Sequence, residues 1–421
     1  MLMNKNKSRI LLVENIHPVA KLELEQSGHE VDTLSYAPDE DELIKLIPQY
    51  TAIGIRSKTE ITAKVLKACH QNLVTIGCFC IGTNQVDLNT AREFGVAVFN
   101  APYSNTRSVA ELVIAEMISL SRQLGDRNMK AHQGDWMKSA DGSFEVRGKT
   151  LGIIGYGHIG TQVSILAEAL GLKVIFFDTV KKLPLGNAQV ASSLEELLGK
   201  ADFVTLHVPE APETMNMIGK KQFSQMKKGS CLINASRGSV VVIDDLVMAL
   251  KEKHIAGCAV DVFPVEPSSN KEKFVSPLQN LPNVILTPHI GGSTEEAQKN
   301  IGSEVAESFR RYLTIGSSSG AVNFPNVDLP IKPGTSRILN VHRNEPGVLG
   351  EINGLISRAG ANIEGQYLST DDKIGYLVMD VGSKEALNLS EEISKLSRSI
   401  KTRMVFLHSK GTEEKIIQVQ S

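Results

Sequence analysis

The sequence predicts an α/β protein with two doubly wound parallel sheets and a smaller C-terminal βαββαβ domain of the ferredoxin-like class. Two stretches in which short apolar runs alternate with helical patterns predict the parallel sheets. A third stretch, after a Gly/Ser/Pro-rich connection, predicts the smaller domain. At 421 residues the chain is too long for a single core, so two or three domains are expected.

The first block is expected to span residues 1–104 and to be completed by residues 294–326. Its predicted strands are Arg9–Val13, Ala52–Ile55, Leu73–Cys80 and Val96–Asn100, with helices at Asp39–Leu46 and Gln85–Phe94. A helix from Thr294 to Tyr312 is expected to return the chain to this block, which makes the block discontinuous.

The second block is expected to span residues 105–293. It opens with a long helix near Ser104 or Asn105, either of which is a good N-cap. Its predicted strands are Leu151–Gly155, Lys173–Asp178, Phe203–Val208, Ser230–Ala235, Gly257–Val262 and Val284–Thr287.

The third block is expected to span residues 337–409, after a hinge at 327–336 and before a frayed polar tail at 410–421. Pro333-Gly334 is the predicted bending point, with few contacts to resist a domain rotation. The predicted elements are Ile338–His342, Gly347–Ala359, Asn362–Thr370, Ile374–Val381, Lys384–Leu396 and Thr402–Leu407, in the order βαββαβ.

Composition excludes several classes of protein. A net charge of −2 provides no electrostatic attraction to nucleic acid or to an anionic membrane. No apolar run approaches the ~18 residues that a membrane span needs. Five cysteines at spacings that fit neither a zinc site nor a redox motif predict reduced thiols, a cytoplasmic location and no metal.

A glycine-rich turn follows the first strand of the second block and predicts a dinucleotide site. Gly155, Gly157 and Gly160 form G-x-G-x-x-G between this strand and an apolar helix, whose N-terminus attracts a pyrophosphate. The next strand ends at Asp178, near the ~20 positions expected for the acid that binds the adenosine ribose. An acid there disfavours a 2′-phosphate, so we expect NAD. The opening turn of the first block, residues 13–18, has no glycine and should not bind a dinucleotide.

Three chemically useful residues follow strand ends of the second block: Arg237, Glu266 and His289. Oxidation of an alcohol beside a carboxylate needs a base, and histidine has a suitable pKa. A neighbouring carboxylate would raise that pKa, and arginine can bind a carboxylate and a carbonyl together. Each residue alone is more often structural; their places at successive strand ends favour catalysis.

The runs NASRG, AVDVFPVEP, TPHIGGST and GYGHIG resemble the D-isomer-specific 2-hydroxyacid dehydrogenases. The resemblance extends over nearly the whole chain through IGCFCIGTNQVDL and NAPYSNTRSVAEL, and is greatest to members that oxidise 3-phospho-D-glycerate. It implies a catalytic triad of Arg237, Glu266 and His289. It implies further NAD contacts from His158, Ile159, Ala235, Ser236, Arg237, Asp261, His289, Ile290, Gly291 and Gly292.

The resemblance also implies substrate contacts. Ile81 and Gly82 would hold the substrate carboxylate, Arg56, Ser57 and Lys58 would face its phosphate, and Asn105 would lie nearby. From the residues alone, Arg56 and Lys58 are as typical of a solvated strand end as of a phosphate-binding site. Relatives usually carry Arg where Lys58 stands, and this departure keeps the charge but weakens bidentate binding. Trp136 and Lys138 match a segment that, in the family, reaches the active site of the neighbouring subunit. The resemblance therefore implies a homodimer or homotetramer.

The third block resembles an ACT domain, a small-ligand sensor. His342, Asn344 and Asn362 are its candidate residues for L-serine, the expected allosteric effector, bound between paired domains. The alternative is a dimerisation module without a ligand. The expected function is therefore NAD-dependent oxidation of 3-phospho-D-glycerate in serine synthesis, with reduction of 2-oxoglutarate as a second implied activity. The alternatives are a glycerate/glyoxylate or lactate enzyme and an NAD-sensing scaffold.

Overall fold

The structure is a computed structural model that describes residues 7–267, 271–382 and 385–407. It divides into two units, one made of Met1–Pro102 with Gln298–Ser421 and the other of Tyr103–Ala297; we call them unit 1 and unit 2. The predicted tail at 410–421 lies outside the described residues.

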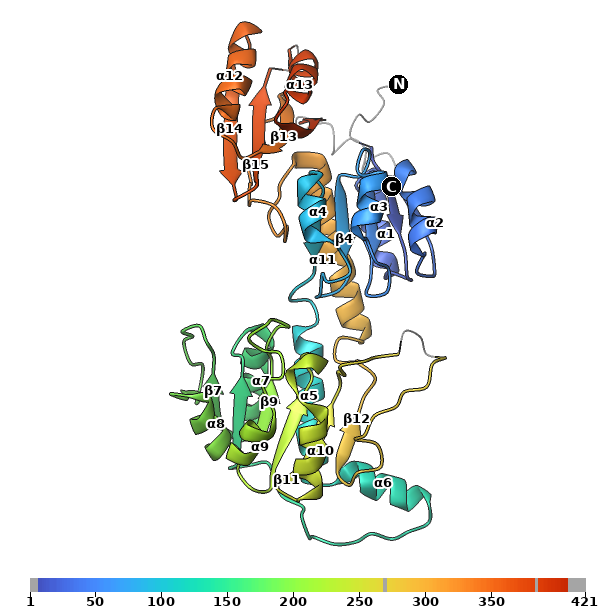
Figure 1. Ribbon diagram of the computed structural model, residues 1–421, viewed down its shortest axis with the longest axis vertical. Coiled ribbons are helices and arrows are strands. Elements are labelled where there is room, and N and C mark those ends of the chain that lie inside the picture. Colours follow the sequence, from blue (N-terminus) through green and yellow to red (C-terminus); the bar gives the residue numbers. More distant parts are fainter. Residues whose placement is uncertain (1–6, 268–270, 383–384, 408–421) are drawn as a thin grey trace, which may run out of the picture. The chain divides into compact units, whose positions relative to one another are not determined.

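Unit 1 begins with a parallel sheet, coloured blue in Figure 1, whose strand order is β2-β1-β3-β4-β5. Its strands are β1 (Arg9–Leu12), β2 (Glu30–Thr33), β3 (Ala52–Ile55), β4 (Thr75–Cys78) and β5 (Ala97–Asn100). The helices are α1 (Pro18–Gln26), α2 (Glu40–Leu46), α3 (Ala63–Cys69) and α4 (Leu88–Glu93), with a 3-10 turn at Ile47–Gln49. The central strands β3 and β4 are buried along their whole length, which is why they read as continuous apolar runs. The edge strand β2 was not predicted, because its sequence EVDT is polar and partly exposed.

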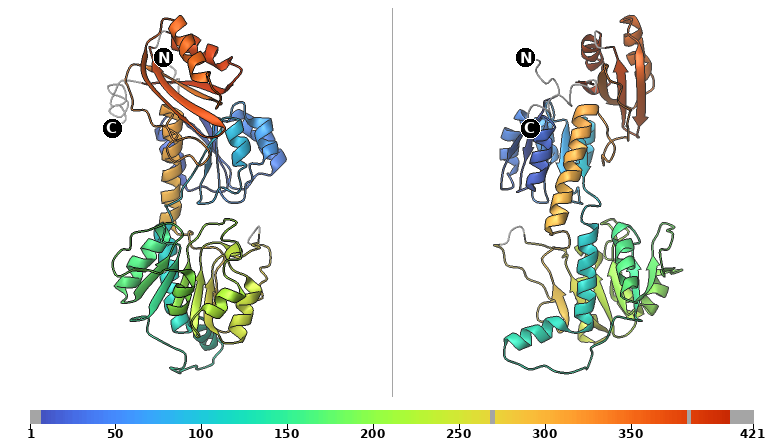
Figure 2. Two further views of the ribbon diagram at one scale, coloured as in Figure 1. Left: turned by 60° about the vertical axis from the view of Figure 1, so that its left-hand side comes forward. Right: turned by 180° about the vertical axis from the view of Figure 1, so that it is seen from behind.

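The C-terminal domain lies in unit 1 and forms an antiparallel sheet in the order β14-β15-β13-β16. Its elements are β13 (Ser336–Arg343), α12 (Val348–Arg358), β14 (Ile363–Thr370), β15 (Ile374–Val381), α13 (Ala386–Ser394) and β16 (Ser399–Phe406). Both helices pack on one face of the sheet, and Figure 2 shows this layer from two further sides. The predicted βαββαβ order is therefore confirmed.

The other face of that sheet shares a hydrophobic core with the first sheet. Leu339, Val341 and Tyr376 join Phe99 and Phe309 in one buried cluster. Phe309 belongs to α11 (Glu295–Ile315), the helix that leads from unit 2 into unit 1. The two sheets of unit 1 therefore exclude water together rather than separately.

The expectation of few contacts around the connection was wrong. Arg337 is completely buried, forms an ion pair with Asp380 at 2.6 and 2.8 Å, and donates to the carbonyl oxygens of Ile315, Leu329 and Pro330. A buried guanidinium needs such partners, because leaving it unpaired would cost several kcal/mol. The Gly/Ser/Pro composition reflects tight turns packed on the core, and composition alone could not show this packing.

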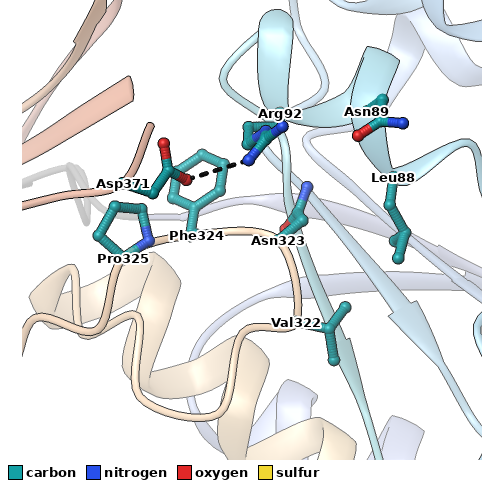
Figure 3. A pocket seen from close by; sticks show the side chains of 8 residues that line it. All are labelled: Leu88, Asn89, Arg92, Val322, Asn323, Phe324, Pro325 and Asp371. Carbon is teal, nitrogen blue, oxygen red and sulfur yellow. Dashed lines mark hydrogen bonds and ion pairs between the residues drawn. The ribbon is translucent and has the colours of Figure 1, made fainter. Parts of the chain in front are cut away.

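A cavity of about 280 Å³ opens beside the connection in unit 1 (Figure 3). Arg92 reaches from α4 across it to Asp371 and Asp372, at 3.4 and 3.1 Å. The amide of Asn323 accepts from the Val98 N–H and donates to the Val96 carbonyl oxygen. Because these polar groups already have partners, the cavity is a structural junction and not a candidate active site.

Unit 2 is a second parallel sheet, in the order β12-β11-β10-β9-β6-β7-β8. Its strands are β6 (Thr150–Ile154), β7 (Lys173–Phe177), β8 (Gln189–Val190), β9 (Phe203–Leu206), β10 (Ser230–Asn234), β11 (Ile255–Val260) and β12 (Val284–Leu286). The helices are α5 (Thr106–Ser121), α6 (Leu124–His132), α7 (His158–Ala169), α8 (Leu194–Lys200), α9 (Lys220–Gln225) and α10 (Ile243–Lys251), with a 3-10 turn at Gly238–Val240. The strand order reverses between β6 and β9, which is where such sheets bind ligands. The predicted fold class is confirmed.

Two details of unit 2 differ from expectation. β11 ends at Val260 rather than Val262, which places Asp261 in the loop beyond the strand. Asn105 is the N-cap residue of α5, but its side chain makes no capping bond, and its Oδ1 is buried without a partner among the described residues. No helix in the described part of the chain is long and apolar enough to cross a membrane.

Candidate active site

The glycine turn after β6 has the geometry that a dinucleotide site requires. Gly155 has a φ of +91°, and a Cβ there would lie 2.3 Å from the His207 carbonyl oxygen. A Cβ on Gly160 would lie 2.2 Å from the Gly155 carbonyl oxygen, so only glycine lets α7 approach the strand. A Cβ on Gly157 would meet nothing within 4 Å among the described residues, so open space faces the turn. The turn thus combines tight packing on one side with room for a phosphate on the other.

The N-terminus of α7 and Asp178 complete this site. α7 begins at His158, so its first N–H groups and the positive end of its dipole lie at the glycine turn. The carboxylate of Asp178 accepts from the Tyr156 N–H at 2.8 Å and the Val180 N–H at 2.8 Å. These bonds fix the acid at the end of β7, where a ribose hydroxyl could donate to a remaining lone pair. His158 also packs against Tyr103, with ring centroids 4.0 Å apart and the ring planes tilted by 43°.

Asp261 holds the loop that carries His289. It is 1% exposed, and its carboxylate accepts from the Thr287 hydroxyl at 2.7 Å, the Ile290 N–H at 2.8 Å and the Gly291 N–H at 2.8 Å. Three donors on one buried carboxylate compensate for its desolvation. The implied role of Asp261 as a cofactor contact remains a prediction, and the structure adds this positioning role.

Sequence reasoning missed Glu116, a buried acid near Asp261. It is 3% exposed, and neither oxygen has a hydrogen-bond partner among the described residues. Burial, together with the negative charge of Asp261, raises the pKa of Glu116 to about 8. Burial therefore favours the neutral, protonated form of the Glu116 carboxyl group. A charged residue among apolar positions of a helix was the available signal.

Glu266 and His289 lie together at the carboxyl end of the sheet. The Nδ1 atom of His289 is 2.8 Å from Oε2 of Glu266, whose Oε1 accepts from the Phe263 N–H at 3.1 Å. This hydrogen bond raises the pKa of His289 although partial burial opposes the shift. Burial acts to raise the pKa of Glu266, but the hydrogen bonds from His289 and Phe263 lower it overall. The pair therefore favours an imidazolium facing a carboxylate.

Arg237 follows β10 and acts on the same pair. Its positive charge helps to lower the pKa of Glu266. The same charge opposes the rise in the pKa of His289 without cancelling it. Its guanidinium donates to the Ser236 carbonyl oxygen at 2.7 Å, and Gly238 next to it packs so closely on Phe263 that a Cβ would overlap the backbone. In the structure, Arg237, Glu266 and His289 are thus close enough for the charge of each to influence the others.

The backbone of His289 is strained. Its φ of +54° is in the left-handed region, which non-glycine residues rarely adopt. The bonds from Ile290 and Gly291 to Asp261 hold this conformation. Such strain persists only where the surrounding structure determines it, and it concentrates at functional sites. Nε2 of His289 has no partner in the described part of the chain, so it is available to a substrate.

The implied substrate residues of unit 1 lie on two loops at one edge of the first sheet. Arg56, Ser57 and Lys58 follow β3, and Ile81 and Gly82 follow the adjacent strand β4. Arg56 is partly exposed, and Ser57 and Lys58 are exposed. The loops adjoin because parallel strands end at a common edge.

Other implied contacts are more scattered. Asn105 lies in unit 2, where a Cβ on Gly292 would come within 2.6 Å of its Nδ2. Trp136 is 86% exposed, and Lys138 is exposed on the same segment. Neither contacts the triad in the described chain, so their implied role at a neighbouring subunit stays a prediction.

The implied serine residues do not meet within one chain. His342, on β13, is 3% exposed and bonds Asn340 through Nδ1 at 3.0 Å, whereas Asn344 donates to the Asp371 carbonyl oxygen. His342 is opposite Gly375, and Gly375 is opposite Thr370 of β14. Asn362 precedes Ile363 at the other end of β14, eight residues from Thr370, or roughly 26 Å along the strand at about 3.3 Å per residue.

Comparisons with known proteins show the family of each part of the chain. Residues 114–291 match the family described as D-isomer specific 2-hydroxyacid dehydrogenase, NAD binding domain, and residues 338–401 match the AHAS small subunit-like ACT domain. The chain is similar in fold to D-lactate dehydrogenase from Aquifex aeolicus complexed with NAD and lactic acid, with a TM-score of 0.66 and 26% identity over 75% of this chain and 100% of that one. Unit 2 is therefore an NAD-binding domain of a D-2-hydroxyacid dehydrogenase, and the expected cofactor is confirmed.

Curated relatives narrow the family. The chain is 50% identical to D-3-phosphoglycerate dehydrogenase of Dictyostelium discoideum, over 96% of this chain and 98% of the relative. It is 51% identical to D-3-phosphoglycerate dehydrogenase of Escherichia coli strain K12, over 96% and 99%. The chain belongs to the D-3-phosphoglycerate dehydrogenase family.

Proposed function

We propose that the chain oxidises 3-phospho-D-glycerate to 3-phosphooxypyruvate with NAD, the first committed step of L-serine synthesis. The observation that carries this proposal is the 2.8 Å bond between His289 and Glu266, with the charge of Arg237 beside both. A histidine oriented by a carboxylate and an adjacent guanidinium match the base and the anion-binding group that this oxidation needs.

Each triad residue has one task. Nε2 of His289 takes the hydroxyl proton, and Glu266 stabilises the imidazolium that forms. Arg237 binds the substrate carboxylate and the developing carbonyl. NAD, when bound, supplies the hydride acceptor. The raised pKa of His289 keeps it protonated for the reverse direction, in which it returns the proton to the carbonyl oxygen.

The substrate phosphate, and a second contact to the carboxylate besides Arg237, are assigned to unit 1. Backbone N–H groups around Ile81 and Gly82 are proposed for the carboxylate, and Arg56 and Lys58 for the phosphate. Neither cation has a side-chain partner in the described part of the chain, so both charges are available to an anion. Arg56 offers the fork that suits a phosphate oxygen pair.

A second candidate is oxidation of an unphosphorylated D-2-hydroxy acid, because the chain has the same fold as a D-lactate dehydrogenase. The two cations after β3, Arg56 and Lys58, favour the phosphorylated substrate. Formation of NADH with 3-phospho-D-glycerate, D-glycerate and D-lactate separates the candidates and also excludes an NAD-sensing scaffold. Comparable kcat/KM for all three acids would contradict the proposal. Reduction of 2-oxoglutarate is tested in the same assay run with NADH.

L-serine is proposed as an allosteric inhibitor bound between two copies of the C-terminal domain. Since Asn362 lies at the opposite end of β14 from His342, one chain cannot provide both, and an antiparallel second copy along the β14 edge would supply the missing amide. The proposed state is therefore a homo-oligomer, dimer or tetramer. A cytoplasmic location is proposed because the five cysteines, all within the described residues, form no disulfide.

Serine titration of phosphoglycerate oxidation tests the regulatory part. Inhibition of the wild type and its loss in Asn344→Ala, with catalysis intact, are expected; a coupling of about 1–3 kcal/mol is ordinary for allostery. Absence of serine binding in calorimetry would leave the domain as an assembly module.

A further inference from the structure

The carboxylate of Glu14 holds the loop that carries Arg56 and Lys58. Its oxygens accept three backbone N–H groups, from Arg56 at 3.1 Å, Lys58 at 3.1 Å and Thr59 at 2.7 Å. Glu14 is only 9% exposed, so these bonds form away from bulk water. These three N–H groups are therefore not available to an anion, whereas the side chains of the loop are.

The backbone of Glu14 is adapted to this contact. The turn after β1 contains no glycine, yet Glu14 has a φ of +62° and Asn15 has a φ of +52°. The left-handed region is tolerated by asparagine but unfavourable for glutamate, and strain of this kind persists only where other contacts maintain it. The three bonds made by the Glu14 side chain are such contacts.

Gln85 joins the same loop to the one after β4. Its Nε2 donates to the Arg56 carbonyl oxygen at 2.9 Å and to Sγ of Cys80 at 3.1 Å, and lies 3.4 Å from the Gly82 carbonyl oxygen. One amide thus connects the residue proposed for the phosphate with the loop proposed for the carboxylate. Both loops then have a fixed separation.

We propose that Glu14 and Gln85 form a brace that sets the spacing between the phosphate-binding and carboxylate-binding loops, so that they select 2-hydroxy acids with a phosphate at the far end. The inference rests on the proposed function. Glu14 and Gln85 are positioning residues, because they act through the loops and do not touch the substrate themselves. A substrate bound at both ends depends on the spacing, whereas one bound only through its carboxylate does not.

The substitution Glu14→Gln distinguishes a carboxylate that positions the loop through hydrogen bonds from one that acts only through its negative charge. A carboxylate that acted only through its charge would repel the phosphate, and its neutralisation would lower KM for 3-phospho-D-glycerate. A brace predicts the opposite sign, because the amide NH₂ of glutamine cannot accept an N–H and at least one of the three bonds is lost. The direction of the change in KM therefore decides between them.

The experiment measures kcat and KM of Glu14→Gln, Gln85→Met and wild type for 3-phospho-D-glycerate and D-glycerate. Gln85→Met keeps an unbranched side chain of similar length but removes the donor. We expect KM for the phosphorylated acid to rise about tenfold in each variant, with kcat within about threefold and KM for D-glycerate nearly unchanged. The double variant should show less than the sum of the two effects, because both act on one loop.

Thr62→Ala is the matched control. Thr62 ends the same loop and caps α3, but its hydroxyl bonds Glu40 and the Val65 N–H and takes no part in the bonds of Glu14 or Gln85, so its loss lowers the melting temperature without changing the ratio of the two KM values. An equal rise in KM for both acids, or a fall for the phosphorylated one, would overturn the brace. A wild type that prefers D-glycerate would overturn the proposed function, and the brace with it.

Discussion

The turn after the first strand differs between the two parallel sheets of this chain, although both turns contain left-handed backbone conformations. After β6, the chain turns through Gly155, whose left-handed conformation costs a glycine nothing, and leaves open space beside Gly157. After β1, Glu14 and Asn15 adopt left-handed conformations although neither is a glycine. The carboxylate of Glu14 then accepts from the loop after β3. A similar strand–turn–helix unit thus suits a dinucleotide in unit 2 and braces a loop in unit 1. The residues of the turn, and not the sheet, decide its role.

The largest expected effect concerns the chemistry assigned to unit 2 alone. His289→Ala should lower kcat by about 10²–10⁴-fold, because the proton acceptor is lost. NADH binding, followed by fluorescence titration, should change little because the glycine turn is intact. A variant with near wild-type kcat would remove His289 from the mechanism.

The comparison of the turns itself predicts opposite responses. Gly155→Ala should destabilise unit 2 by about 1–3 kcal/mol and weaken NADH binding, since its Cβ would meet the His207 carbonyl oxygen. Asn15→Gly should leave stability unchanged or raise it by up to about 1 kcal/mol, because it relieves a left-handed non-glycine residue. Denaturant unfolding measures both. Equal destabilisation by the two substitutions would show that the turns are under the same constraint.

A smaller effect is expected from Glu266→Gln. The bond to Glu266 raises the pKa of His289, and oxidation requires the neutral imidazole. The wild-type kcat/KM for oxidation should therefore rise with pH through this raised pKa. Loss of the carboxylate should move that rise to lower pH while lowering kcat, because the imidazolium is no longer stabilised. The pH profile of the variant is the check, and a rise at unchanged or higher pH would exclude the pairing from the mechanism.

The sequence predicts the regular parts of this molecule better than the contacts that hold its loops. β3 and β4 are fully buried and read as apolar runs, whereas β2 and β8 are short, mostly exposed strands with little apolar pattern. Arg237, Glu266 and His289 were identifiable because parallel strands end at one edge. The long-range bonds of Glu14 and the three donors on Asp261 were not, since they join residues far apart in sequence. The core that the two sheets of unit 1 share could not be predicted from composition either.

The most direct test of the central claim is the ratio of kcat/KM for 3-phospho-D-glycerate to that for D-glycerate, in wild type and Arg56→Ala. If the chain reads the phosphate through unit 1 and performs the oxidation with unit 2, the wild type should strongly favour the phosphorylated acid. Arg56→Ala should reduce that preference by about 10–100-fold, the equivalent of a hydrogen-bonded charge pair of roughly 1.5–3 kcal/mol, and leave kcat/KM for D-glycerate nearly constant. A wild type without the preference, or an Arg56→Ala variant that retains it in full, would contradict the account.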